Sequence, residues 1–432
     1  MAKLNRFVPD VVVTPLSTED VIRVVGYAYE HDIPIIPRGA GTGETCGAVA
    51  LSGGIVMDLS LWDNIVEVDI ANMQTLVRPG VIHAKLNQHL AGFGLFFPPD
   101  PGSSRMCTIG GMVANNASGL KAVKYGSTEQ YVLGLDVVLP TGGLITTGGV
   151  GARTIKNVSG LNLTKLFVGS EGTLGIITMI RLKVLPKPKG RGIVMAAFSD
   201  LDHAPETVLH VYSAGILPSC IEILDNSAIT AVNTYRPELS LPDAEAILLF
   251  EVDGSPCGVK EEGEEIAGIA KERAILVEWA TEPKRMASLW EARSVLATAA
   301  ARIRPDGTRI FAGEDISVPL ARVVDALRGI RALGQEYGIR VVNFGHIGDG
   351  NVHTAPVLDP ENPDEVERAK QLVDAIHRLA IKLGGSTTGE HGVGAVRIDY
   401  AGEEHGAALD AMRSIKKALD PKGIMNPGKL IP

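Results

Sequence analysis

Two histidines bracket a Gly-Asp-Gly turn in the segment HIGDGNVH, which runs from His346 to His353. Asp-Gly between short extended segments is a hairpin signal, so the two imidazoles can come back toward each other across the turn. Further along the chain, Glu390 and His391 lie in the glycine-flanked sequence GEHG. Two histidines and a carboxylate suit a divalent metal with open coordination positions, and the spare histidine suits a general base. On local spacing alone, a tight hairpin with surface histidines and an unrelated glutamate is the alternative.

The segments around this hairpin predict a sheet that helices cover. RVVNF (340–344) is the strand that leads into the first histidine, and further strands are expected at 193–198 and 246–252. Amphipathic helices are expected at 258–272, 283–302, 320–337 and 364–383. Strands and helices in this order favour an α+β domain with an antiparallel sheet that helices cover.

Three glycine-rich segments lie beside predicted strands in the first half of the chain: RGAGTGETCG (38–47), TIGGMVANNASG (108–119) and GSEGTLG (169–175). The first follows a short strand, but its G-x-G-x-G spacing and the strand-like residues after it do not match a Rossmann fingerprint. Backbone N–H groups of such coils can form a nest around a pyrophosphate. Three loops of different length favour a long extended ligand, and a glycine-rich barrel without a ligand is the alternative.

Composition narrows the class of protein. The chain has 432 residues, which predicts two or three domains, and its apolar and charged fractions of 45% and 21% are those of a globular protein. A net charge of −9 without a long basic run argues against nucleic-acid binding. The four cysteines are scattered and form no iron–sulfur motif. Because no membrane span and no apolar signal segment are found, the expected compartment is the cytoplasm, with membrane association through a partner left open.

Seven motifs occur in a fixed order along the chain: PRGAGTG, PPDPGSS, CTIGGMVANNASG, GSEGTLGIIT, HIGDGNVH, GEHGVG and DPKGIMNPGK. Together they resemble the FAD-linked 2-hydroxyacid dehydrogenases of the vanillyl-alcohol oxidase (PCMH-type) flavoprotein fold. That family includes D-lactate dehydrogenases, the glycolate oxidase D-type subunit and D-2-hydroxyglutarate dehydrogenase. The resemblance implies an FAD-binding domain of two α+β subdomains at 1–189, an α+β cap domain with an antiparallel sheet at 190–400, and a C-terminal helix and tail at 401–432 that pack back on the FAD domain.

The resemblance also implies which residues bind FAD. The expected residues are Arg38, Gly39, Ala40, Gly41, Thr42, Gly43, Pro99, Asp100, Ser103, Gly110, Gly111, Asn115, Ala117, Glu171, Gly172, Gly175 and Ile176. Some relatives attach FAD covalently through a histidine in the first glycine loop, which here reads RGAGTG and has none. Cys107 is therefore expected to be a small buried residue, and FAD to be bound non-covalently.

By the same resemblance, His346, His353 and Glu390 match a divalent-metal site, which suits Zn²⁺, Mn²⁺ or Fe²⁺. His391 matches the catalytic base and Arg293 the arginine that binds the substrate carboxylate, with Asn351 as a further substrate contact. The alternative for Arg293 is a salt bridge on a helix surface. D-2-hydroxyglutarate enzymes carry a Thr and a Lys where this chain has Ala297 and Gly313, so a second substrate carboxylate is not expected.

These features predict oxidation of a small (R)-2-hydroxyacid, with D-lactate to pyruvate favoured, glycolate next and D-2-hydroxyglutarate after it. The chain has no NAD or haem motif, so an external electron acceptor is expected: an iron–sulfur subunit, an electron-transfer flavoprotein, a quinone or a cytochrome. A flavin sugar or alcohol oxidase is disfavoured because metal-free oxidases need neither HIGDGNVH nor GEHG. A non-catalytic FAD-binding subunit is the alternative from another class.

Overall fold

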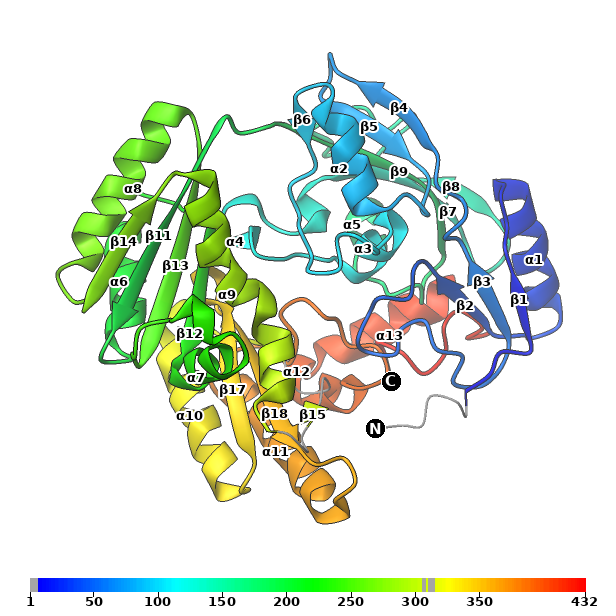
Figure 1. The fold of residues 1–432 in the computed structure, drawn as a ribbon. Helices are drawn as coiled ribbons and strands as arrows, with labels where there is room; N and C mark the ends of the chain where they lie inside the picture. Colours follow the sequence, from blue (N-terminus) through cyan, green and yellow to red (C-terminus); the bar gives the residue numbers. More distant parts are fainter. Residues whose placement is uncertain (1–6, 305–307, 310–314) are drawn as a thin grey trace. The chain divides into compact units, whose positions relative to one another are not determined.

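The computed structural model of the chain describes residues 7–304, 308–309 and 315–432, which fall into two compact units (Figure 1). The FAD unit, as we name it, consists of Met1–Gly119, Gly126–Lys187 and Glu390–Pro432. The cap unit consists of Leu120–Tyr125 and Pro188–Gly389, so it ends at Gly389 rather than at residue 400. The short segment belongs to the cap unit because its side chains bond there: Nζ of Lys124 and the hydroxyl of Tyr125 donate to Asp253 at 2.7 and 2.9 Å.

The FAD unit contains two main sheets and one two-stranded ladder. The strands of the parallel sheet, in the order β1-β3-β2, are β1 (Val11–Val13), β2 (Ile35–Arg38) and β3 (Ile55–Asp58). Those of the antiparallel sheet, in the order β4-β5-β9-β7-β8, are β4 (Ile65–Asp69), β5 (Gln74–Val77), β7 (Val132–Val138), β8 (Leu144–Thr146) and β9 (Ile176–Lys183). The ladder pairs β6 (Leu95–Phe96) with β10 (Leu185–Pro186).

The FAD unit also contains the following described helices. They are α1 (Thr18–Glu30), α2 (His83–Ala91), α3 (Ile109–Asn115), α5 (Leu163–Phe167), α12 (Ala401–His405) and α13 (Ala408–Leu419). In α1, the hydroxyl of Ser17 accepts from the N–H of Asp20, and Val21 and Val25 are fully buried. One prediction was wrong: residues 109–115, expected to be part of a glycine-rich loop, form α3. Thr108 caps this helix by accepting from the N–H of Gly111, so the helix forms despite its two glycines.

The cap unit is built on one antiparallel sheet in the order β14-β11-β13-β12-β17-β18-β15, with β16 also paired to β18. Its strands are β11 (Gly190–Phe198), β12 (Cys220–Asp225), β13 (Ala246–Gly254), β14 (Leu276–Ala280), β15 (Thr308–Arg309), β16 (Ile316–Ser317), β17 (Arg340–His346) and β18 (Asn351–Leu358). Its helices are α4 (Ala122–Tyr125), α6 (His203–Ser213), α7 (Asn226–Tyr235), α8 (Pro256–Ala270), α9 (Pro283–Arg302), α10 (Val323–Glu336) and α11 (Pro363–Lys382). Short 3-10 turns occur at 128–130, 237–239, 320–322, 347–349 and 398–400 across the two units.

Helices cover both faces of the cap sheet. One apolar core joins the sheet to α6, α8, α10 and α11, and a second core joins the opposite face to α7 and α9 (Figure 1). Strand side chains are accordingly buried on both faces; all six residues of β12 are buried. This confirms the antiparallel sheet covered by helices that the sequence predicts, and it means that any charged side chain on β12 must find its partners inside the unit.

The hairpin between β17 and β18 forms where the Asp-Gly signal predicts it. Gly350 has φ of +83°, and a Cβ at this position would lie 2.0 Å from the carbonyl oxygen of Val318, so only glycine fits. Oδ1 of Asp349 accepts from the N–H of Asn351 at 3.3 Å, which gives Asp349 a role in the turn. The register pairs Phe344 with His353 and His346 with Asn351.

Candidate active site

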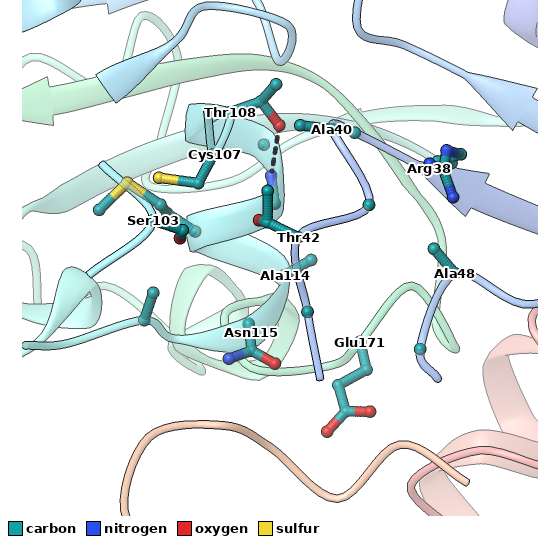
Figure 2. A pocket seen from close by; sticks show the side chains of 18 of the residues that line it. Arg38, Ala40, Thr42, Ala48, Ser103, Cys107, Thr108, Ala114, Asn115 and Glu171 are labelled. Carbon is teal, nitrogen blue, oxygen red and sulfur yellow. Dashed lines mark hydrogen bonds between the residues drawn. The ribbon is translucent and has the colours of Figure 1, made fainter. Parts of the chain in front are cut away.

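A cavity of about 330 Å³ lies within the FAD unit (Figure 2). Most of the residues that the sequence predicts as FAD contacts line it: Arg38, Gly39, Ala40, Gly41, Thr42, Gly43, Ser103, Gly110, Gly111, Asn115, Ala117, Glu171, Gly172 and Gly175. Three separate glycine-rich segments therefore meet around one hollow, as expected for a long ligand.

The first glycine loop supplies unpaired donors to this cavity. No backbone N–H from Ala40 to Glu44 donates to any residue that the structure describes, although this loop directly follows a strand. The loop packs tightly on the start of α3: a Cβ on Gly39 would lie 2.2 Å from Oγ1 of Thr108. Backbone N–H groups without a protein acceptor can bind phosphate oxygens, and Arg38 adjoins this loop. The lining thus fits the pyrophosphate of FAD.

Three predicted FAD contacts are not among the lining residues: Pro99, Asp100 and Ile176. Ile176 is fully buried in the core of the unit, and its neighbour Ile177 lines the cavity in its place. Successive side chains of a strand point to opposite faces, so a motif locates the strand but not the side that faces the ligand. Pro101 and Gly102, which directly follow Pro99 and Asp100, line the cavity instead.

Cys107 is buried and lines the cavity, as the sequence predicts for a small buried residue, and burial raises the pKa of its thiol.

Several other lining residues were not predicted from the sequence. They are Pro37, Glu44, Thr45, Gly47, Ala48, Leu59, Pro79, Thr108, Met112, Ala114 and Ser118. Most of them lie inside the glycine-rich segments 38–47 and 108–119, so those segments were the available signal.

Glu390 and His391 line the same cavity, from the start of the last segment of the FAD unit. The backbone of this segment is held by the cofactor loops: Nδ2 of Asn115 donates to the carbonyl of Glu390 at 2.8 Å, and Oγ1 of Thr45 to that of His391 at 3.4 Å. The carboxylate of Glu171 accepts from the N–H groups of Val393 and Gly394, both at 2.8 Å. The histidine predicted as catalytic base therefore belongs to the wall of the cavity that fits FAD.

Two carboxylates flank the imidazole of His391 within the FAD unit. Oε2 of Glu44 lies 3.7 Å from Nδ1, and Oε1 of Glu390 lies 3.8 Å from Nε2. The side chain of His391 retains one-fifth of its accessible surface, so it is open enough to meet a small molecule. Burial raises the pKa of Glu171, against the opposing effect of the two N–H groups that it accepts.

Arg293 and His346 share a partner in the cap unit, Glu222, which was not predicted from the sequence. Glu222, on β12, is fully buried and bonds to both: Nε of Arg293 donates to Oε2, and Nδ1 of His346 faces Oε1. Burial alone would raise the pKa of Glu222, but the neighbouring His346 and Arg293 outweigh it and hold the pKa below its usual value. A glutamate inside the apolar strand sequence CIEILD was the signal that could have identified it.

The two hairpin histidines converge inside the cap unit. Nε2 of His353 lies 3.3 Å from Nε2 of His346, and both side chains are buried. Two imidazole nitrogens that face each other in this way can both act as ligands of one divalent cation. Asn351, predicted as a substrate contact, donates from Nδ2 to Oδ1 of Asp315 at 2.7 Å, while its Oδ1 has no partner among the described residues.

Arg293 is placed on α9, and its partner Glu222 is internal, so the salt bridge is not one of the helix surface. The guanidinium also lies over the ring of Phe344, 5.0 Å from its centroid. Ala297 follows Arg293 by about one helical turn on the same helix. Gly313, the other position used to judge substrate size, lies outside the described residues.

Comparison with solved structures places the fold among FAD-binding oxidases of the p-cresol methylhydroxylase type. 4-Ethylphenol oxidase from Gulosibacter chungangensis matches with a TM-score of 0.79 and 20% identity, over 97% of this chain and 88% of that chain. p-Cresol methylhydroxylase matches with a TM-score of 0.76 and 18% identity, over 97% and 88% respectively. The expected fold is thereby confirmed.

The chain belongs to the FAD-linked oxidase family. The family model described as "FAD linked oxidases, C-terminal domain" matches residues 187–430, and an "FAD binding domain" model matches residues 9–148. The chain is similar to the glycolate oxidase subunit GlcD of Bacillus subtilis (39% identity over 98% of this chain and 89% of that protein). It is also similar to a D-lactate dehydrogenase of Archaeoglobus fulgidus (36% identity over 98% and 91%). The predicted family is confirmed: this is an FAD-linked oxidoreductase of the D-lactate dehydrogenase and glycolate oxidase type.

Proposed function

We propose that the protein oxidises a small (R)-2-hydroxyacid to the 2-oxoacid, with D-lactate to pyruvate as the favoured reaction. The observation that supports this proposal best is the position of His391, which lines the same cavity as the glycine loops that fit FAD. An imidazole at the wall of a flavin site can remove the hydroxyl proton of a substrate whose C2 faces the flavin.

Arg293 binds the substrate carboxylate in this proposal. A guanidinium presents paired N–H donors to a carboxylate, which fixes the orientation of the C2–H bond. Asn351 is proposed as a further contact to the substrate. His391 accepts the proton of the C2 hydroxyl while the C2–H bond breaks, and the carbon–oxygen single bond becomes the carbonyl of the product. When bound, FAD accepts the hydride that leaves C2.

His346 and His353 are proposed as ligands of a divalent metal, Zn²⁺, Mn²⁺ or Fe²⁺, with Glu390 as the carboxylate ligand that the resemblance to the family implies. Such an ion makes a bound hydroxyl more acidic. The Nε2 atoms of the two buried histidines support this assignment, because they lie 3.3 Å apart and imidazole nitrogens so placed suit one cation.

The electrons then pass to an external acceptor: an iron–sulfur subunit, an electron-transfer flavoprotein, a quinone or a cytochrome. No described helix is long and apolar enough to cross a membrane. A cytoplasmic location, with attachment to a membrane through such a partner, remains part of the proposal. The FAD is proposed to be non-covalent because the first glycine loop has no histidine.

The substrate is proposed to be small because Ala297 offers no polar group for a second carboxylate one turn after Arg293. Glycolate is the second candidate substrate and D-2-hydroxyglutarate the third.

The visible spectrum of the FAD-loaded protein tests these candidates directly. We expect bleaching of the flavin band by D-lactate and none by L-lactate. Bleaching by glycolate or D-2-hydroxyglutarate in preference to D-lactate would replace the substrate. No bleaching by any of them, at full FAD and metal occupancy, would favour a non-catalytic FAD-binding subunit.

A further inference from the structure

Glu222 lies near the middle of the cap sheet, on β12 between β13 and β17. Its side chain has no exposed surface, and each carboxylate oxygen is used by a different residue: Oε2 by Nε of Arg293 and Oε1 by Nδ1 of His346. One buried carboxylate thus bonds both the proposed substrate-binding arginine and a proposed metal ligand.

We infer that Glu222 is a positioning residue that sets the geometry of Arg293 and the tautomer of His346 together. It serves carboxylate binding and metal binding through one side chain. The inference rests on the proposed function and deepens it, because neither role of Glu222 has a purpose unless Arg293 binds substrate and His346 binds a metal.

The carboxylate of Glu222 decides which nitrogen of His346 carries the proton. An ionised carboxylate only accepts hydrogen bonds, so Nδ1 of His346 must carry the proton that lies between them. A neutral imidazole with its proton on Nδ1 has its lone pair on Nε2, the atom that faces Nε2 of His353 at 3.3 Å. Glu222 therefore leaves the metal-facing nitrogen of His346 unprotonated. Carboxylates that accept from the second nitrogen of a ligating histidine fix the ring in this way.

Glu222 uses one of the three guanidinium nitrogens of Arg293. Glu222 takes Nε, and no hydrogen bond from Nη1 or Nη2 of Arg293 to a described residue is found. The two terminal nitrogens therefore stay available to a second carboxylate. The ring of Phe344 beneath the guanidinium limits its rotation. Arg293 can accordingly bind a substrate while it remains bonded to Glu222.

Replacing Glu222 by Gln keeps its size but disturbs both contacts. The amide offers one acceptor atom and one NH₂ group, so the NH₂ group must face a donor, either Nε–H of Arg293 or Nδ1–H of His346. If it faces His346, the imidazole relieves the conflict by moving its proton to Nε2, which blocks metal binding. If it faces Arg293, the guanidinium loses its anchor.

A second buried glutamate provides a matched control. Glu251 lies on the neighbouring strand β13, is 1% exposed, and accepts from Nε1 of Trp290 on α9 at 3.0 Å. It has cation partners in Arg191 and Lys121 and bonds to neither Arg293 nor His346 in the described structure. Glu251→Gln thus removes a comparable buried charge beneath the same helix and leaves the two contacts in question intact.

The test measures two quantities on the full-length, FAD-loaded protein after chelation: the dissociation constant of Zn²⁺ and of Mn²⁺ by calorimetry, and KM and kcat for D-lactate after reloading. For Glu222→Gln we expect metal affinity to fall by about 10- to 100-fold, the range typical of lost outer partners of ligating histidines, together with a rise in KM. Glu251→Gln should leave the metal dissociation constant within about twofold of the parent value. Arg293→Lys should raise KM and leave metal affinity unchanged, which separates the two roles of Glu222.

Glu222→Asp carries the test if the Gln variant does not fold. Its carboxylate is one methylene shorter and cannot reach both partners, so metal affinity or KM should change from the parent value. Parent-like metal affinity and KM in either folded variant overturn the inference while the proposed function stands. A parent protein that binds no divalent metal and is not reduced by any 2-hydroxyacid overturns both.

Discussion

The carboxylate of Glu171 accepts a 2.8 Å hydrogen bond from the backbone N–H of Gly394, which lies 223 positions later in the chain. A second bond of the same length comes from Val393. Glu171 itself has φ of +49°, in the left-handed region, and lines the cavity. The residue thus joins the third glycine loop to the segment that carries His391, so the loops that fit the cofactor also position the proposed base.

Glu171→Gln should weaken both the folded structure and the positioning of His391. The amide cannot accept from both N–H groups without turning its NH₂ group toward a donor, so we expect a loss of about 1–3 kcal/mol in the free energy of unfolding. Because the segment that carries His391 is then less restrained, kcat should fall by roughly 10- to 100-fold. Denaturant unfolding and steady-state kinetics with D-lactate measure the two effects. Exposed Glu19, changed to Gln, is the control. Parent-like stability and kcat would show that the hydrogen bonds from Val393 and Gly394 to Glu171 are dispensable.

His391→Ala should lower the rate of flavin reduction by about 10²- to 10⁴-fold, the usual contribution of a general base. The FAD content of the purified variant should remain close to that of the parent, because the glycine loops are unchanged. Stopped-flow bleaching of the flavin band by D-lactate gives the rate. His405→Ala, an exposed histidine of α12, should behave as the parent. Unchanged reduction in the His391 variant would remove its assignment as the base.

Metal removal should abolish turnover without removing FAD. After dialysis against a strong chelator, we expect the flavin spectrum to persist and bleaching by D-lactate to be lost. Stepwise addition of Zn²⁺, Mn²⁺ or Fe²⁺ should restore activity with at least one of these ions, since two imidazoles and a carboxylate accept each of them. Full activity in a preparation shown by elemental analysis to be metal-free would rule out the metal role.

Acid should destabilise the FAD unit through His83. This side chain is 2% exposed, its Nδ1 lies 2.7 Å from Oγ of Ser104, and burial lowers its pKa to about 4. The unfolded chain therefore takes up a proton between pH 6.5 and 4 that the folded chain does not, so stability is full above pH 6.5 and falls as the pH drops toward 4. Lowering the pKa of His83 from 6.5 to about 4 corresponds to a contribution of at most roughly 3 kcal/mol to the free energy of unfolding.

Denaturant unfolding of the parent and of His83→Gln at pH 7.5 and 4.5 measures this contribution. The variant should be less stable than the parent at pH 7.5, because the buried contacts change. Its loss of stability between the two pH values should be smaller than that of the parent. An equal loss in both proteins would assign the acid sensitivity to other groups.

Much of the fold was predictable because its signals are local. Ser17 caps α1 three residues before the N–H that it accepts, and Gly350 is required by the turn in which it lies. The α3 helix was missed because its glycines outweigh its apolar residues in any local pattern, whereas the structure forms it from the Thr108 cap and from Ile109, Met112 and Val113, which are buried.

The sequence by itself determined the family, the glycine loops and the histidine hairpin, because each is a short motif whose chemistry resides in adjacent residues. Only the tertiary structure decided which side of β9 faces the cavity, and that Arg293 and His346 share Glu222 across 71 and 124 positions of chain. No local pattern predicts a bond of that span. It exists because a charge buried in an apolar strand is stable only where folding brings its partners to it.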